Sequence, residues 1–126
     1  MLVLAALLLG GCAPAAPKAT APEYRKITAA QAKEKMEAEA AYTLLDVRTE
    51  DEFYEAHIEG AILIPDFEIA ARAEGDLPDK GALIFIYCRS GRRSALAAKE
   101  MLGMGYTNVY DFGGIIDWPY ETVEGK

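Results

Sequence analysis

Apolar positions in this chain fall into short runs that are separated by longer stretches in which apolar and polar residues mix. The short runs cover 42–47, 61–64, 83–87 and 108–112, and runs of this length favour strands. The mixed stretches between them predict helices over 28–40, 50–56, 66–73 and 94–102. Strands that alternate with helices predict an α/β fold, with a parallel sheet of about five strands and helices on both faces.

Local signals define the ends of these elements. Thr28 and Gln31 have the spacing of a capping box and mark the start of the first helix. Residues 77–81 combine Pro, Asp and Gly and predict a turn. Gly103 and Gly105 end the helix that begins near 94. The last predicted strand is followed by a short helical end around residue 118.

The first residues differ from the rest of the chain. Residues 1–9 are almost wholly apolar, too few to cross a bilayer as a helix, and fit the apolar part of a signal peptide. Leu9-Gly10-Gly11-Cys12 resembles the bacterial lipobox, whose cysteine is lipid-modified and becomes the new N-terminus. No Lys or Arg precedes the apolar run, and an uncleaved, non-lipidated leader is the alternative. We expect a signal peptide at 1–11 and a membrane anchor on Cys12.

Three parts of the chain follow from this interpretation. Residues 12–23 form a lipidated Cys and an Ala/Pro-rich spacer, which extends by about 3.1 Å per residue if proline keeps it stretched. A merely disordered tail has the same composition. Residues 24–126 form one domain. The anchor places that domain outside the cytoplasm, in a bacterial periplasm or at the cell surface.

Charge and cysteine content narrow the function. The formal net charge is −7, so we expect no nucleic-acid partner. The basic cluster Arg89, Arg92 and Arg93 stands out against this background and suggests a small anion. The chain has two cysteines. If Cys12 carries lipid, Cys88 has no partner for a disulfide, and a lone thiol in an exported protein indicates reactivity.

The run Cys88-Arg89-Ser90-Gly91-Arg92-Arg93-Ser94 carries the chemistry. It follows the predicted strand at 83–87 and precedes a predicted helix. A tight glycine-containing loop directs backbone N–H groups toward one centre, and the helix adds its positive N-terminal end. Both favour an anion, so Cys88 is expected to be held as the nucleophilic thiolate.

Three segments of the chain resemble a single rhodanese domain, and together they span about residues 24–120. The first holds Asp46-Val47-Arg48, Glu52-Phe53, His57-Ile58, Gly60-Ala61 and Ile64-Pro65. The second is Ile86-Tyr87 with the loop 88–94. The third holds Leu102-Gly103-Met104-Gly105-Tyr106, Val109, Gly113-Gly114 and Trp118.

The resemblance implies a sulfurtransferase. Its cysteine, here Cys88, would attack the outer sulfur of thiosulfate or a related donor, release sulfite and keep a persulfide, which cyanide or a thiol then accepts. Two half-reactions of this kind give ping-pong kinetics. No base is needed for a thiol that is already ionised, and we expect neither a cofactor nor a metal.

The loop residues Arg89, Ser90, Gly91, Arg92, Arg93 and Ser94 are expected to bind the substrate anion. Gly91 permits a backbone conformation that a β-carbon would block. Arg93 closes the loop and is the arginine that best orients it. Ser94 either caps the following helix or donates a hydrogen bond to the sulfur, and the sequence leaves both open.

Outside the loop, polar residues have structural interpretations. Asp46 and Arg48 follow a strand and so lie near the site, but a structural ion pair, with Glu52 as another partner, is favoured over a role with substrate. His57, the single histidine, is interpreted as a structural hydrogen-bonding residue. Tyr106 and Trp118 are expected to pack in the core or at its rim.

Two other functions stay open. Dual-specificity phosphatases and arsenate reductases share the fold, but their loop has five residues between cysteine and arginine. Here Cys88 and Arg93 are separated by four, which leaves less room for a tetrahedral phosphate and favours sulfur. The other alternative is a persulfide carrier or binding module without turnover.

Overall fold

The computed structural model describes residues 22–126. Its centre is a sheet of five parallel strands in the order β1-β5-β4-β2-β3. The strands are β1 (Arg25–Lys26), β2 (Thr43–Asp46), β3 (Ile62–Leu63), β4 (Ile84–Cys88) and β5 (Val109–Gly114). The helices are α1 (Ala29–Ala38), α2 (Glu50–Glu55), α3 (Ile69–Asp76) and α4 (Arg92–Gly103), with 3₁₀ turns η1 (Asp66–Glu68) and η2 (Ile115–Asp117).

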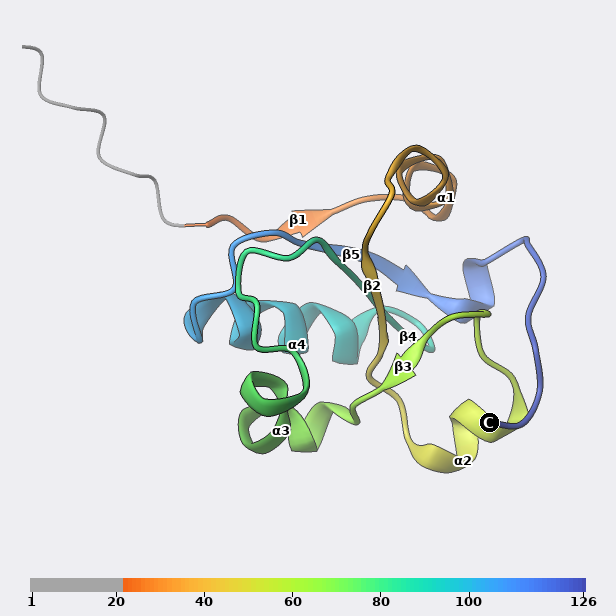
Figure 1. The fold of residues 1–126 in the computed structure, drawn as a ribbon. Coiled ribbons are helices and arrows are strands. Elements are labelled where there is room, and N and C mark those ends of the chain that lie inside the picture. The colour runs from red at the N-terminus through yellow and green to blue at the C-terminus, as the bar shows by residue number, and fades with distance from the viewer. Residues whose placement is uncertain (1–21) are drawn as a thin grey trace, which may run out of the picture.

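Helices cover both faces of the sheet, so the predicted fold class is confirmed. Helix α1 lies on one face, and α3 and α4 lie on the other (Figure 1). Side chains of β4 alternate between the two sides, as strand geometry requires. Ile84, Ile86 and Cys88 pack in the cluster under α3 and α4, whereas Phe85 and Tyr87 pack in the cluster under α1. Each face therefore has its own apolar core.

Capping boxes begin two of the helices. The predicted box at α1 is confirmed, since the Thr28 side chain accepts from the Gln31 N–H and the Gln31 side chain accepts from the Thr28 N–H. The same motif occurs at α2, where Thr49 and Glu52 exchange these bonds. The second box fixes the position of Glu52, which matters for the site.

Two predictions about the elements need correction. Helix α4 begins at Arg92, two residues before the predicted start at Ser94, because Gly91 turns the backbone with φ +105° and leads directly into the helix. Strand β1 was not predicted, since its two residues are polar and exposed. It forms by pairing with the interior strand β5, with Lys26 beside Asp111.

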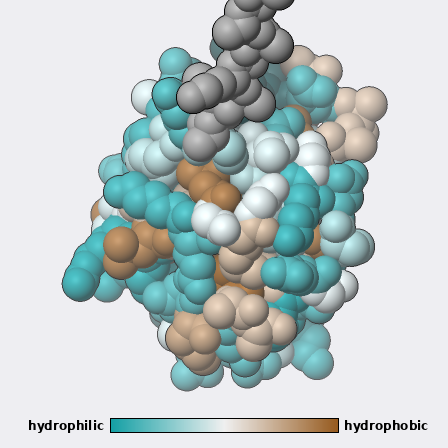
Figure 2. Space-filling view, turned by 90° about the vertical axis from the view of Figure 1, so that its left-hand side faces the viewer, coloured by the Kyte–Doolittle hydropathy of each residue, from teal (hydrophilic) through white to brown (hydrophobic). Residues whose placement is uncertain are grey.

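The surface is mainly hydrophilic on the side shown in Figure 2, with apolar residues in separate areas. Within 22–126, no helix is long and apolar enough to span a bilayer. The predicted signal peptide, Cys12 and nearly all of the predicted spacer lie outside the described residues, so their assignment stays a prediction.

Candidate active site

Cys88 is the last residue of β4, in the interior of the sheet. Ligands of parallel α/β sheets bind at this carboxyl edge of the strands. The side chain is only 1% exposed and belongs to the apolar cluster that contains Val47 and Ile64. The residue is therefore more buried than a loop position suggests.

Two polar groups contact the sulfur. The Gly91 N–H donates to Cys88 Sγ over 3.0 Å, and the Ser94 hydroxyl oxygen lies 3.5 Å from the same atom. Helix α4 starts next to this loop and runs for 12 residues. Its N-terminal partial charge and the Gly91 N–H both stabilise negative charge on sulfur. The arrangement thus has the anion-stabilising features that the loop sequence predicts.

Glycine at two positions lets the backbone close around the sulfur. Gly91 has φ +105°, a conformation that disfavours a side chain. Gly114 ends β5, and a β-carbon there would stand 2.0 Å from the carbonyl oxygen of Arg89. The sequence places Gly114 in the resemblance, but its close approach to the loop is visible only once β5 is paired with β4.

The three loop arginines have different environments. Arg93 donates two hydrogen bonds to Glu52, at 2.7 and 2.8 Å. This pair lowers the pKa of Glu52 to about 2 and raises the pKa of Arg93. Arg89 and Arg92 are exposed and form no ion pair with the described residues. Of the three loop arginines, these two have a charge that no carboxylate of residues 22–126 compensates.

Asp46 and Arg48 form the predicted ion pair. Arg48 Nε and Nη2 donate to the Asp46 carboxylate, with the shortest bond at 2.7 Å, and both side chains are buried. Burial opposes the charge, but the hydrogen bonds and charge of Asp46 raise the pKa of Arg48. Glu52 pairs with Arg93 and not with Asp46 or Arg48. Arg48 also lines a hollow of about 380 Å³ together with Arg89.

Ser94 has a role that differs from a helix cap. It is the third residue of α4, and Gly91, which precedes the helix, has no side chain to cap it. The Ser94 hydroxyl donates to Asp111 Oδ1 over 2.8 Å. Asp111 was missed by the sequence reasoning, although a carboxylate within the apolar run at 108–112 is the signal that marks it.

Other polar and aromatic residues have structural environments. His57 is buried, stacks on Phe53 with ring centres 3.7 Å apart, and its Nδ1 lies 2.9 Å from the Phe53 carbonyl oxygen. The Tyr106 hydroxyl donates to the Leu77 carbonyl, and Trp118 packs under α1. These positions agree with the structural interpretations. Within residues 22–126 there is no group of three or more His, Cys, Asp and Glu placed to hold a metal.

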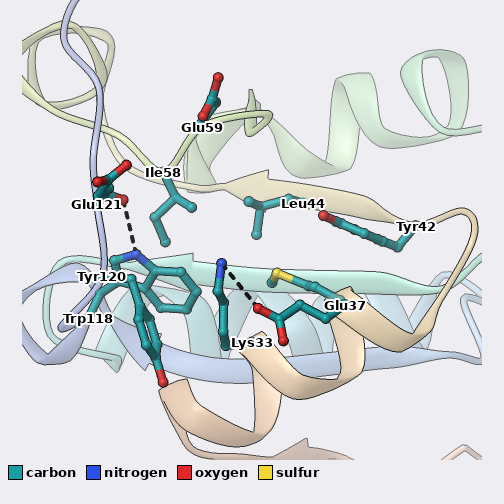
Figure 3. A pocket seen from close by; sticks show the side chains of 10 residues that line it. Lys33, Glu37, Tyr42, Leu44, Ile58, Glu59, Trp118, Tyr120 and Glu121 are labelled. Atoms are coloured by element: carbon teal, nitrogen blue, oxygen red, sulfur yellow. Dashed lines mark hydrogen bonds and ion pairs between the residues drawn. The ribbon is translucent and has the colours of Figure 1, made fainter.

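Two further hollows differ in their chemistry. A groove of about 550 Å³ lies on the α1 face, where Trp118, Tyr120 and Tyr42 surround an apolar floor (Figure 3). Its lysine, Lys33, pairs with Glu37, and none of the lining residues is a cysteine. A second hollow of about 500 Å³ lies beside the loop and is lined in part by Ser90, Gly113 and Lys26. Of these two hollows, only the second adjoins the loop at residues 88–94, hereafter the thiol loop.

The family model of the rhodanese-like domain matches residues 28–119. This chain belongs to the rhodanese-like family. The boundaries of the match include every element from α1 to η2.

Two relatives of this rhodanese-like protein are named sulfurtransferases. Thiosulfate sulfurtransferase PspE of Escherichia coli (strain K12) is 37% identical over 86 residues, which cover 68% of this chain and 83% of PspE. Adenylyltransferase and sulfurtransferase UBA4 of Candida albicans is 42% identical over 91 residues. The match covers 68% of this chain but only 21% of UBA4. A solved rhodanese with anions from E. coli superposes with a TM-score of 0.60 at 38% identity, and the match covers 68% of this chain and all of that one.

Proposed function

We propose that Cys88 is the sulfur-carrying nucleophile of a thiosulfate sulfurtransferase. Its thiolate attacks the outer sulfur of thiosulfate or a related donor, the sulfur–sulfur bond of the donor breaks, and sulfite leaves with the bonding electrons. The resulting Cys88 persulfide passes its outer sulfur to cyanide or a thiol. The contact that carries the proposal is the hydrogen bond from the Gly91 N–H to Cys88 Sγ at the start of α4.

The substrate anion is bound by the exposed side of the loop. Arg89 and Arg92 supply two positive charges that no carboxylate of the described residues compensates, and the Gly91 N–H contacts the sulfur. The exposed Ser90 supplies a further polar group of the same loop. Arg93 is neutralised by Glu52 and holds the loop in place. The four residues between Cys88 and Arg93 form a compact loop, which suits the addition of one sulfur atom better than a tetrahedral phosphate.

Mass spectrometry of the protein after thiosulfate treatment tests the intermediate. The peptide that contains Cys88 should gain the mass of one sulfur atom and lose it again when cyanide is added. Cys88→Ser should abolish both the adduct and thiocyanate formation, whereas Cys12→Ala, the matched control, should retain both. An adduct without turnover would indicate a carrier, and Cys88-dependent hydrolysis of aryl phosphates would contradict sulfur transfer.

We also propose that the protein is a lipoprotein outside the cytoplasm, with a signal peptide at 1–11, a lipid on Cys12 and a spacer at 12–23. The support is the lipobox-like sequence Leu9 to Cys12. Fractionation of cells that express the full chain tests it. Cys12→Ala should leave the leader uncleaved and remove incorporated radiolabelled fatty acid, and equal labelling of the variant would exclude lipid on this residue.

A further inference from the structure

Asp111 is a buried charge that the proposed reaction does not use. It lies in β5, which pairs with β4 beside α4 (Figure 1), and its side chain is fully buried. Its Oδ1 accepts from the Ser94 hydroxyl and from the Gly113 N–H, each at 2.8 Å. Its Oδ2 accepts from the Tyr24 hydroxyl. The Lys26 ammonium lies 3.9 Å from Oδ2 and is half exposed.

Ser94 connects this carboxylate to the thiol. The Ser94 hydroxyl has three acceptors in reach, namely Asp111 Oδ1 at 2.8 Å, the Gly91 carbonyl at 3.2 Å and the Gly113 carbonyl at 3.4 Å. The carboxylate is the nearest and the only charged one, so it takes the hydrogen. A lone pair of Ser94 Oγ then faces Cys88, whose S–H donates over 3.5 Å. The chain of donors therefore runs from Cys88 through Ser94 to Asp111.

We propose that Asp111 accepts the proton of Cys88 through the Ser94 hydroxyl when the thiol becomes the attacking thiolate. The S–H bond breaks and its proton binds Ser94 Oγ, while the former hydroxyl proton of Ser94 moves to Asp111 Oδ1. One negative charge moves from the carboxylate to the sulfur, and the net charge is unchanged. This inference rests on the proposed role of Cys88 as the nucleophile, and it replaces the expectation that the thiol needs no base, since the Cys88 S–H donates to Ser94.

The surroundings of Cys88 and of Asp111 can each stabilise the negative charge that remains when the two groups share one proton. A thiolate and a carboxylate linked through one buried hydroxyl repel each other, so the site favours one negative charge over two. On the sulfur, the charge is stabilised by the Gly91 N–H and α4. On Asp111, it is stabilised by Gly113 and Tyr24. Burial and the neighbouring Asp111 raise the pKa of Tyr24, which keeps this hydroxyl a donor.

During the reaction cycle, the same proton is held by Asp111 and then returned to Cys88. While Cys88 carries the persulfide anion, Asp111 stays protonated, because the negative charge remains on sulfur. When the acceptor removes the outer sulfur, the thiolate regains its proton from Asp111 through Ser94. Asp111 never contacts the substrate, so its effect is confined to the ionisation of Cys88.

Alkylation of Cys88 in the resting protein tests the shared proton without any sulfur transfer. The test uses the full chain with Cys12→Ala, and the rate at which iodoacetamide alkylates Cys88 should rise in two steps with pH. In the first step the pair of Cys88 and Asp111 loses one of its two protons, and thiolate forms wherever Asp111 holds the other. In the second step this shared proton is lost as well. Asp111→Asn retains an acceptor for Ser94 but removes the base and its charge. Its profile should have a single step, at lower pH than the second step of the protein with Asp111, because the repelling carboxylate is gone. Superimposable profiles would overturn the proposal.

Infrared difference spectra provide the second test. Thiosulfate treatment of the same protein should increase the C=O band of a protonated carboxyl group, because the persulfide anion keeps the proton on Asp111. The band should be lost in Asp111→Asn and in Ser94→Ala, and retained in the exposed control Asp51→Asn. A band that survives Asp111→Asn would overturn the proposal. If Cys88 takes up no sulfur at all, the proposed function fails, while the alkylation profile still decides the proton transfer.

Discussion

Arg93 and Glu52 form a two-bonded ion pair that joins the first turn of α4 to α2. The capping box of α2 fixes the glutamate, and the thiol loop ends at the arginine. The loop is thus held at both ends, by β4 at Cys88 and by this pair at Arg93. The pair compensates the charge of Arg93, whereas Arg89 and Arg92 form no ion pair with the described residues.

Glu52→Gln should destabilise the domain in a pH-dependent way. The pKa of Glu52 is lowered from 4.5 to about 2 in the fold, so its stabilisation is complete above pH 4.5 and is lost as the pH falls toward 2. We expect a loss of about 1–2 kcal/mol at pH 7, reduced by partial exposure of the pair. Urea unfolding at pH 7 and at pH 2.5 measures both values.

The contrast between the two pH values separates this pair from a general effect of the substitution. The difference between wild type and Glu52→Gln should shrink at the lower pH. Glu37→Gln, in an exposed pair with Lys33, should cost about 0.5 kcal/mol or less at either pH. An equal loss for Glu52→Gln at both pH values would show that its charge is not what stabilises the fold.

Arg89→Gln and Arg92→Gln should weaken binding of thiosulfate. Each removes an exposed positive charge beside the thiol loop, and a loss of roughly 1 kcal/mol of charged interaction corresponds to a KM about fivefold higher. Steady-state kinetics with varied thiosulfate measures this. Arg72→Gln removes the same charge from α3, where Arg72 pairs with Glu68 and Asp76, and should leave KM unchanged. Unaltered KM in both loop variants would remove the arginines from the anion site.

The buried pair of Asp46 and Arg48 should behave as structure. Asp46→Ala leaves the Arg48 charge buried without its partner, which costs about 3–5 kcal/mol. Replacing both residues together, by Leu and Met, should cost much less, because no unpaired charge remains. Denaturant unfolding of the single and double variants measures the difference. If Arg48→Met instead raised the KM for thiosulfate at little cost in stability, Arg48 would belong to the substrate site.

Much of this architecture follows from local sequence signals. The apolar runs predict strands β2 to β5, and Thr28 with Gln31 predicts the start of α1, because these features depend on neighbouring residues. Strand β1 and the partners of Arg93 and Ser94 depend on residues far apart in the chain. Glu52 is separated from Arg93 by 41 positions, and Asp111 from Ser94 by 17. Only the order of strands in the sheet brings them together, which is why Asp111 was missed.

Gly114→Ala should damage the thiol loop more than the rest of the fold. A β-carbon at this position meets the Arg89 carbonyl oxygen at 2.0 Å, so either β5 or the loop must move. We expect a loss of about 1–3 kcal/mol in stability, as for other overpacked sites. Displacement of the loop should also lower the rate of sulfur transfer at least tenfold in protein that is still folded.

Gly75→Ala is the matched control, because its β-carbon meets nothing within 4 Å and alanine favours the helix by about 0.5–1 kcal/mol. Equal activity in the two variants would mean that the loop tolerates the shift, and that the contact between Gly114 and Arg89 does not set the geometry around Cys88.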